Sequence, residues 1–370
     1  MRVLAALSGG VDSAVAAARA VAAGHDVTAV HMALSSTQAA TRCGSRGCCT
    51  VEDADDARRA AMLLGIPFYI WDLAEEFEQT VVSDFLREYE AGRTPNPCIR
   101  CNEFVKFREL SARAEALGFD AVCTGHYASI VEGPSGLELH RARCLEKDQS
   151  YVLAVMGRAE LTRVLFPLGD VASKAEVRAE AERAGLPMSA KPDSYDICFI
   201  PDGDTAGFLR RHLGERPGDI VDTEGNVVGQ HRGAYAYTVG QRKGLGLSRP
   251  ARDGRPRYVV RTDQHRNTVV VGAAQLLSVD EIRTGPLTLL VDESDPALQG
   301  ESEITAQYRA HGSVVHGRMH LEGSAGAVVT LSAPARAVAA GQSIVFYSGT
   351  RVLAQATITG AERRGAPDKE

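Results

Sequence analysis

Residues Arg2-Val3-Leu4-Ala5-Ala6-Leu7, followed at once by Ser8-Gly9-Gly10-Val11-Asp12-Ser13, decide how the chain begins to fold. The first stretch is apolar and of strand length, and an alanine-rich helical stretch follows the second. Glycines in a strand-to-helix turn let backbone N–H groups approach an anion, and the positive end of the following helix points to the same place. The sequence therefore predicts a phosphate-binding loop, to which Ser8 and Ser13 add hydroxyl donors.

Asp12 is the unusual member of this loop. A carboxylate inside a phosphate cradle repels its ligand unless it holds Mg²⁺ or meets a donor group. We therefore expect the loop to handle a polyphosphate that carries Mg²⁺. The alternative is an ordinary glycine-rich turn, but the combination of strand, helix, Asp12 and Ser13 favours the phosphate loop.

The composition is that of a globular protein. The chain has 370 residues, of which 44% are hydrophobic and 24% charged, so two or three domains are expected and disordered or fibrous classes are excluded. Polar residues interrupt the first apolar run, and no membrane-length stretch follows, which predicts a cytoplasmic protein without signal peptide or membrane span. In that compartment the eight cysteines are expected to be catalytic, metal-binding or buried rather than a disulfide framework.

The formal net charge of −6 argues weakly against a nucleic-acid partner, but it hides a local excess of basic residues. Between His231 and Arg266 there are nine Arg or Lys against two Asp. Such a stretch is either a solvated basic surface or a site for phosphate groups, and charge alone does not decide between them.

Strand-like and helix-like segments alternate up to about residue 125. Strand patterns cover 26–33, 67–71 and 120–125, and helical patterns cover 51–64, 75–91 and a stretch ending at 117. Strands separated by helices imply a parallel sheet whose ligands bind at the carboxyl ends of the strands. Ser8 to Ser13, Met32 and Gly125 all fall at such ends, so we expect them to line one pocket.

The pattern changes in the second half of the chain. Ser173 to Glu176 is a capping box that begins a helix ending at Gly185. From about residue 219, short β-branched runs alternate with glycine-containing turns, and helical periodicity disappears. We therefore expect an α/β domain over 1–205, a small mixed domain over 206–276 and a β-barrel, or else a sandwich, over 277–370.

Cys98 and Cys101 form a C-x-x-C pair at the start of a predicted helix. Asn96 suits the N-cap and Pro97 the first helical position. Unpaired N–H groups there favour a thiolate, so a nucleophile or a metal ligand is expected, although a lone C-x-x-C also occurs in zinc sites and redox pairs.

The remaining cysteines are less informative. Cys198 has aromatic and aliphatic neighbours in sequence, so a buried inert thiol is the default unless it meets Cys101 in space. Cys123 and Cys144 lie in strand-like runs and are expected in the core. A Gly-rich stretch contains Cys43, Cys48 and Cys49, and a zinc site, a redox triad and plain surface thiols remain open for them, with none favoured.

Six motifs, taken in order, resemble the bacterial tRNA-specific 2-thiouridylase family within the ATP-pyrophosphatase superfamily, and the resemblance spans nearly the whole chain. The motifs are Ser8 to Ser13, Asn96 to Asn102 with Lys106-Phe107, Thr124 to Ala128, Lys147 to Tyr151, Ile197 to Ile200 and Tyr237 to Gly246. The resemblance implies an N-terminal domain like the adenine-nucleotide hydrolases. It also implies that O2 of the wobble uridine, in tRNAs for Lys, Glu and Gln, is replaced by sulfur.

The resemblance further implies a division of labour among the motif residues. The uracil O2 is a poor leaving group, and AMP transferred onto it from ATP makes it a good one. The cysteine matching Cys198 carries a persulfide received from a sulfur carrier or a cysteine desulfurase. Cys101 is its partner thiol, and a Cys101–Cys198 disulfide that forms on sulfur delivery is reset by a thiol reductant.

The same match implies two sets of binding residues. ATP is expected at Ala6, Leu7, Ser8, Gly9, Gly10, Val11, Asp12, Ser13, Met32 and Gly125. The target base is expected near Asn96, Pro97 and Cys98, and other contacts with tRNA at His126, Lys147, Asp148, Gln149, Tyr308, Arg309 and Gln342. Each of these side chains also has a purely structural alternative.

One departure from the family pattern leaves the chemistry open. Many members carry Asp where this chain has Cys98, so no acid–base role is expected of that position here. Cys98, Cys101 and Cys198 could instead hold an iron–sulfur cluster whose fourth iron is open to a sulfide. Two alternative hypotheses for the function are an ATP-dependent amide-forming synthetase and a non-catalytic RNA-binding protein with structural zinc.

Overall fold

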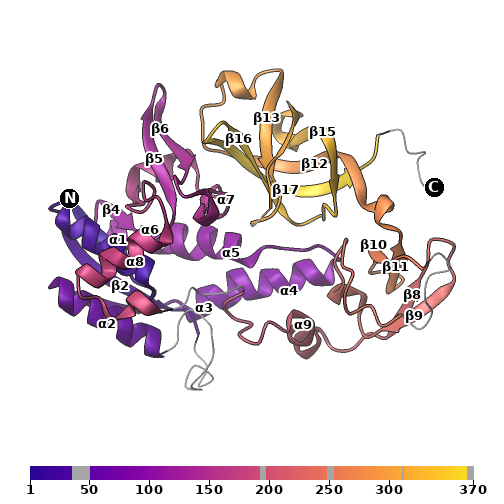
Figure 1. Cartoon of the computed structure of the whole chain (residues 1–370), viewed down its shortest axis with the longest axis horizontal. Helices are drawn as coiled ribbons and strands as arrows, with labels where there is room; N and C mark the ends of the chain where they lie inside the picture. The colour runs from indigo at the N-terminus through magenta and orange to yellow at the C-terminus, as the bar shows by residue number, and fades with distance from the viewer. Residues whose placement is uncertain (36–50, 192–196, 248–253, 311, 365–370) are drawn as a thin grey trace.

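The computed structural model describes residues 1–35, 51–191, 197–247, 254–310 and 312–364. Figure 1 shows an elongated molecule with the α/β domain at one end and the C-terminal barrel and central domain at the other. Cys43, Cys48 and Cys49, two of the basic residues (Arg249 and Arg252) and the charged tail after Arg364 lie outside the described residues.

A five-stranded parallel sheet forms the centre of the N-terminal domain. Its strand order is β3-β2-β1-β4-β7. The strands are β1 (Arg2–Ala6), β2 (Asp26–Ala33), β3 (Phe68–Asp72), β4 (Ala121–Cys123) and β7 (Val164–Leu165). The alanine-rich face of α1 (Val11–Ala22) packs closely on this sheet, with α2 (Val51–Leu64) and α8 (Lys174–Arg183) joining the same core. This arrangement puts the loop between β1 and α1 at the carboxyl edge of the sheet.

Two helical runs extend from this sheet toward the other domains, and each contains a π-helical stretch. The first consists of α3 (Ala74–Phe77), the π segment η2 (Glu78–Val82) and α4 (Ser83–Glu90). The second consists of α5 (Pro97–Arg100), the π segment η3 (Cys101–Glu109) and α6 (Leu110–Ala116). The π segments, which periodicity did not predict, begin at Glu78 and Cys101, and such segments often occur at functional sites.

The rest of the N-terminal domain is made of short elements. They are β5 (Ala128–Gly133), β6 (Gly136–Arg141), η4 (Leu145–Lys147), α7 (Ser150–Leu153), η5 (Arg158–Arg163) and η6 (Pro187–Ala190). Ser173 caps α8 by accepting a hydrogen bond from the backbone N–H of Glu176, as the capping box predicted. Cys144 is buried as expected, but it lies after β6 rather than in a strand.

The central domain has a four-stranded sheet of order β10-β11-β8-β9 beside one helix. Its elements are α9 (Thr205–Leu213), β8 (Gly218–Val221), β9 (Val227–His231), η7 (Ala234–Ala236), β10 (Tyr258–Asp263), β11 (Thr268–Gly272) and η8 (Ala274–Leu277). Val259, Val269 and Val271 are buried in its small core.

Six antiparallel strands form the C-terminal barrel, which confirms the predicted fold class. They are β12 (Ser278–Leu289), β13 (Glu301–Gln307), β14 (Val315–Leu321), β15 (Ala327–Arg336), β16 (Ser343–Ser348) and β17 (Arg351–Glu362), with short turns η9 (Pro296–Leu298) and η10 (Gly323–Ala325). Pairing of β12 with β17 closes the barrel, so the sandwich alternative is wrong.

The barrel is fastened to the N-terminal domain beside the C-x-x-C segment. The β5–β6 hairpin continues the barrel sheet, since β6 pairs with β17. Tyr151 donates its hydroxyl to the carbonyl of Ser343 at 2.9 Å, and the Thr94 N–H donates to the carbonyl of Ala340 at 2.9 Å. The stretch that leads into Cys98 is therefore held between two domains.

Candidate active site

The loop after β1 has the geometry of an anion cradle. Gly9 has φ of +77°, and a Cβ there would lie 2.3 Å from the Asp53 carbonyl oxygen, so only glycine fits. Gly10 is the N-cap of α1, and no side chain from the described residues caps this helix. The hydroxyl of Ser13 accepts from the Ser8 N–H at 3.1 Å and donates to the Gly10 carbonyl at 3.0 Å. The N-terminal N–H groups of α1 are thus left for an anion.

Asp12 meets donor groups in this structure. Its carboxylate accepts from the Lys174 ammonium at 2.6 Å and from the Tyr127 hydroxyl at 2.6 Å. The carboxylate is partly exposed and the Lys174 side chain is mostly buried. Lys174 therefore offsets, at the mouth of the loop, the negative charge that would otherwise oppose a phosphate.

A second lysine ties the loop to the start of α2. The Lys191 ammonium donates to the Gly9 carbonyl at 3.1 Å and to the carboxylates of Asp53 and Asp56, both at 2.7 Å. Burial lowers the pKa of Lys191, but the hydrogen bonds and charges of the two carboxylates outweigh it and raise that pKa above its ordinary value. Lys191 remains a cation beside the loop and directly precedes the stretch that leads to Cys198.

The other residues expected to hold ATP lie around this loop. Ala6 ends β1, and the Leu7 carbonyl contacts His31 Nδ1 at 2.9 Å. A Cβ on Gly125 would lie 2.5 Å from the Ser13 nitrogen, so the turn after β4 approaches the first turn of α1. Met32, near the end of β2, packs against the hydrophobic cluster that contains Cys101.

The C-x-x-C pair lies at a helix start as predicted. The Asn96 side chain accepts from the Cys98 N–H at 3.0 Å, and Pro97 is the first helical residue. Cys98 is exposed and Cys101 is buried. The two thiols therefore have different surroundings although they are three residues apart.

Cys101 and Cys198 share one hydrophobic cluster. Cys101 is a buried member of a cluster that also contains Phe77, Phe85 and Tyr235, and Cys198 is partly buried and packs against that cluster. Phe199 holds the Cys198 turn in place, since its ring makes edge contacts with Phe77 and Phe85 at centroid distances of 5.8 and 5.3 Å. Both thiols therefore belong to one cluster, and direct contact between Cys101 and Cys198 stays a prediction.

Cys123 belongs to the core of the α/β domain. Its thiol is fully buried in β4 and donates to the Ala16 carbonyl at 3.6 Å, and burial raises its pKa to about 12. A thiol with that pKa is not a nucleophile at neutral pH.

His126 is a buried neutral imidazole. Its Nδ1 lies 2.8 Å from the Thr124 hydroxyl, and its ring contacts Phe107 and Phe166. Burial, followed by the positive charge of Lys106, lowers the pKa of His126 well below its usual value. A group that stays neutral in the folded state while it titrates in the unfolded chain makes stability depend on pH.

We expect this histidine to make the N-terminal domain sensitive to acid. Because its pKa is lower in the folded state, its contribution is present above about pH 6.5 and is lost as the pH falls, by roughly 1 kcal/mol between pH 7.5 and 5.5. Urea unfolding followed by fluorescence of Trp71, the one tryptophan in the chain, reports on this domain. His126→Gln should lose less stability over that interval than wild type, and the exposed His320→Gln should behave as wild type. Equal pH slopes in all three proteins would contradict this assignment.

The Lys147 to Gln149 motif is bound into the domain interface. Asp148 accepts hydrogen bonds from the Arg141 guanidinium, the Ala142 N–H and the Ser150 hydroxyl at 3.1, 2.9 and 2.8 Å. Gln149 accepts from the Tyr127 N–H at 3.0 Å. Arg141 also stacks on the Tyr347 ring of the barrel at 3.7 Å. The Asp148 carboxylate and the side-chain oxygen of Gln149 are therefore engaged within the protein.

Residues 308, 309 and 342 lie on the barrel side of the same interface. Arg309 is exposed and donates to the Ala337 carbonyl at 2.6 Å, with its guanidinium 5.6 Å from the Tyr308 ring. Among the residues that the structure describes, the side-chain oxygen of Gln342 is buried without a hydrogen-bond partner. A buried acceptor without a hydrogen bond costs free energy, and a donor from water or from a bound molecule would satisfy it.

Sequence reasoning missed the two lysines of the phosphate site. Lys174 was seen only as part of a capping box, and Lys191 was not singled out. A carboxylate in a phosphate-binding loop implies that a cation lies close to it. Nothing in the spacing of the sequence indicates which lysine the fold places there.

The described ranges contain neither a candidate metal site nor a helix that could span a membrane. No three His, Cys, Asp or Glu side chains among them come together as a metal site. In the same ranges, no helix has the length and apolar character needed to cross a bilayer.

Three family models match successive parts of the chain. Their descriptions are a tRNA methyl transferase HUP domain over residues 1–202, a tRNA methyl transferase PRC-barrel domain over 206–273 and an aminomethyltransferase beta-barrel domain over 279–358. The first alone covers more than half of the chain.

Curated relatives match over almost the full length. The tRNA-specific 2-thiouridylase MnmA of Beutenbergia cavernae is 62% identical over 368 residues, covering 98% of this chain and 96% of the relative. The protein of the same name from Acidothermus cellulolyticus is 59% identical over 363 residues, covering 98% and 99%. A solved 4-thiouridine synthetase in complex with RNA and ATP is 16% identical, and the match covers 57% of this chain and 50% of that one. Its TM-score is 0.32, and this similarity carries no argument.

Proposed function

This chain belongs to the tRNA-specific 2-thiouridylase family, and from that premise we propose that it replaces O2 of the wobble uridine with sulfur in tRNAs for Lys, Glu and Gln, using ATP. The observation that carries the chemistry is the packing of Cys101 and Cys198 in one cluster with Met32, whose strand runs beside the phosphate loop. This arrangement joins a nucleotide site to a pair of thiols.

We propose that ATP binds with its phosphates in the Ser8 to Ser13 loop. The uncapped N-terminus of α1 and the lysines at positions 174 and 191 would stabilise the charge that develops on pyrophosphate as it leaves. Asp12 is the residue of the loop that would hold a Mg²⁺ ion, since Mg²⁺ commonly takes one or two carboxylates at sites for substrate phosphates. Bound Mg²⁺ would neutralise phosphate charge.

The proposed reaction has three steps, after which a reductant resets the thiols. The uracil O2 attacks the α-phosphorus of ATP, pyrophosphate leaves and AMP stays bonded to O2. The terminal sulfur of a Cys198 persulfide then attacks C2, and AMP departs with the oxygen. Finally the Cys101 thiolate attacks Cys198 Sγ, which breaks the S–S bond, leaves sulfur on C2 and forms a Cys101–Cys198 disulfide. A thiol reductant returns both cysteines to thiols.

The persulfide route needs two cysteines, whereas the iron–sulfur alternative needs three around one cluster. Cys98 is exposed while Cys101 is buried, and no metal-ligand group forms among the described residues. These residues do not fit a cluster in this arrangement, and we propose the persulfide route.

We propose that tRNA lies across the interface between the N-terminal domain and the barrel. The buried oxygen of Gln342 and the exposed Arg309 support contact with RNA there. The Asp148 carboxylate and the Gln149 side-chain oxygen, which are engaged internally, would position Arg141 and Tyr127. We further propose that the domains span 1–205, 206–276 and 277–370 and that the protein is cytoplasmic. The proposed sulfur donor is a sulfur carrier or a cysteine desulfurase.

Nucleoside mass analysis tests the proposed activity. Unmodified tRNA for Glu, incubated with the enzyme, ATP, Mg²⁺ and a persulfide source, is expected to yield 2-thiouridine together with equal amounts of AMP and pyrophosphate. Replacing oxygen by sulfur and adding a methyl group give different masses, so the same spectrum also detects methylation. Product that forms without ATP, or a methylated nucleoside, would contradict the proposal, and turnover of ATP on a small acid without tRNA would favour the amide-forming synthetase.

A further inference from the structure

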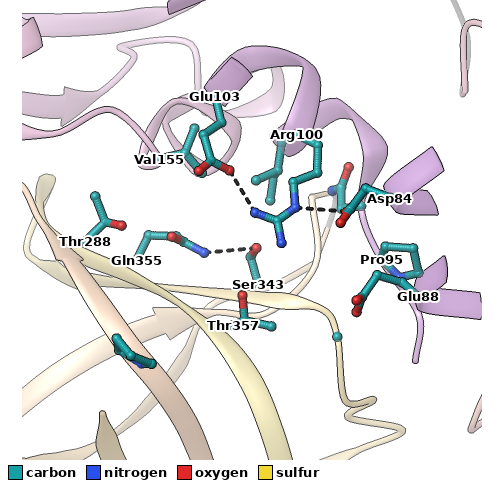
Figure 2. A pocket seen from close by; sticks show the side chains of 14 residues that line it. Asp84, Glu88, Pro95, Arg100, Glu103, Val155, Thr288, Ser343, Gln355 and Thr357 are labelled. Atoms are coloured by element: carbon teal, nitrogen blue, oxygen red, sulfur yellow. Dashed lines mark hydrogen bonds and ion pairs between the residues drawn. The ribbon is translucent and has the colours of Figure 1, made fainter. Parts of the chain in front are cut away.

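A polar pocket lies between the N-terminal domain and the barrel, next to the C-x-x-C segment. Figure 2 shows it enclosed on one side by residues of α4 and α5 and on the other by strands of the barrel. The empty space within it, which includes open solvent, is about 610 Å³. No residue expected to bind ATP lines it, so it is separate from the phosphate loop.

The N-terminal side of the pocket is built around Arg100. Its Nε donates to Asp84 at 3.1 Å and its Nη1 to Glu103 at 2.8 Å. The remaining nitrogen, Nη2, makes no hydrogen bond with the residues that the structure describes. Figure 2 shows the guanidinium directed across the pocket toward Ser343. Two carboxylates thus fix the guanidinium and leave one donor edge facing the pocket.

The barrel side offers hydroxyl and amide groups. Gln355 and Ser343 are both buried, and the Gln355 amide N–H donates to the Ser343 hydroxyl at 3.1 Å. That bond holds the amide in place and leaves its oxygen as an acceptor. The hydroxyl groups of Thr288 and Thr357 line the same wall.

Charge selects the class of occupant. Arg100 is balanced by Asp84 and Glu103, and Glu88 is paired with Arg93 through two bonds of 2.6 Å. Since Arg87 is also bonded to Asp84, the three carboxylates are matched by three guanidinium groups, and no excess of positive charge attracts a phosphate there. A neutral, flat ring with donors and acceptors on its edge matches the fixed groups instead.

The position of the pocket indicates where such a ring comes from. Asn96 lines the pocket and begins the segment expected to approach the target base. On the barrel side, Gly341 and Ser343 line it and flank Gln342, whose buried oxygen lacks a partner among the described residues. Bases of single-stranded RNA loops are commonly splayed into separate pockets.

We propose that this pocket receives one base of the tRNA anticodon loop next to the target uridine, with Arg100, Gln355 and the threonine hydroxyls reading its edge. The inference rests on the proposed function for the identity of the RNA. It adds a second base-binding site, which would set how the loop is held while the target base reaches the thiols.

The test combines a filled pocket with RNA that lacks one base. Binding is measured by fluorescence anisotropy with labelled anticodon-arm hairpins, each with an abasic site at a different loop nucleotide. Thr357→Phe should weaken binding of the intact hairpin by roughly tenfold or more, as expected for loss of one base contact. One abasic hairpin should bind wild type about as weakly, and Thr357→Phe should weaken its binding no further, because both changes remove the same contact.

Two further variants serve as controls for the effect of Thr357→Phe. Thr359→Phe carries the same substitution on the exposed part of β17 outside the pocket and should bind intact hairpin as wild type does. Thr357→Val removes the hydroxyl without adding volume, and it replaces Thr357→Phe if that variant unfolds. Additive losses at every loop position would overturn the pocket assignment. Thiolation by wild type is assayed separately, so failure of the proposed function is seen there and not in the binding cycle.

Discussion

Serine in place of Cys198 or Cys101 is expected to lower the rate of tRNA thiolation by about a thousandfold or more. A serine hydroxyl carries no persulfide sulfur, and it cannot attack a neighbouring sulfur to form a disulfide. The phosphate loop lies outside the cluster that contains both thiols, so single-turnover release of pyrophosphate should persist in both variants. The measurement is the yield of 2-thiouridine by mass spectrometry against the yield of pyrophosphate.

The two variants should fail at different steps. In Cys198→Ser no sulfur reaches the tRNA. In Cys101→Ser the persulfide still attacks C2, but no internal thiol breaks the S–S bond, so a tRNA–protein adduct that dithiothreitol releases should accumulate. Cys144→Ser, a change at another buried cysteine outside this cluster, should thiolate at close to the wild-type rate. Normal thiolation by Cys198→Ser would contradict the assignment of that residue.

Local sequence signals predicted the fold well where a single segment determines its own structure. The strand at 26–33 and the helix at 51–64 follow apolar periodicity and end at turn residues, and the structure has them with those bounds. The capping box at Ser173 likewise specified its own helix. Pairings between distant segments carry no such local signal. Nothing in 128–141 indicates that its hairpin joins the barrel through His140 and Arg351.

The features of the candidate site also differ in whether local sequence predicts them. The loop glycines and the Asn96-Pro97 helix start follow from backbone rules that any sequence of this type obeys. The partners of Asp12 are Tyr127 and Lys174, which lie 115 and 162 positions further along the chain, so only the folded sheet brings them to the loop. The pocket around Arg100 could not be predicted from local sequence, since six of its fourteen lining residues come from the barrel.

Replacement of Lys174 by methionine is expected to lower kcat/KM for ATP by about a hundredfold, the usual effect of removing one group that stabilises developing charge. The methionine keeps most of the apolar length of the side chain but leaves the Asp12 carboxylate without its ammonium partner, 2.6 Å away in the wild type. The exposed negative charge then opposes the phosphates of ATP. Steady-state release of pyrophosphate with saturating tRNA, at several ATP concentrations, measures the effect.

A double-mutant cycle with Asp12→Asn shows how Lys174 acts. If the lysine serves only to neutralise Asp12, the Lys174→Met change should cost little in the Asp12→Asn background, because no carboxylate remains to be neutralised. If its ammonium transfers to the leaving pyrophosphate during reaction, which we expect from its place at the first position of α8 beside the loop, the full loss should persist. Arg183→Met, at the other end of the same helix, is the matched control and should leave kcat/KM for ATP unchanged. Undiminished turnover by Lys174→Met would show that the backbone of the loop suffices to hold the phosphates.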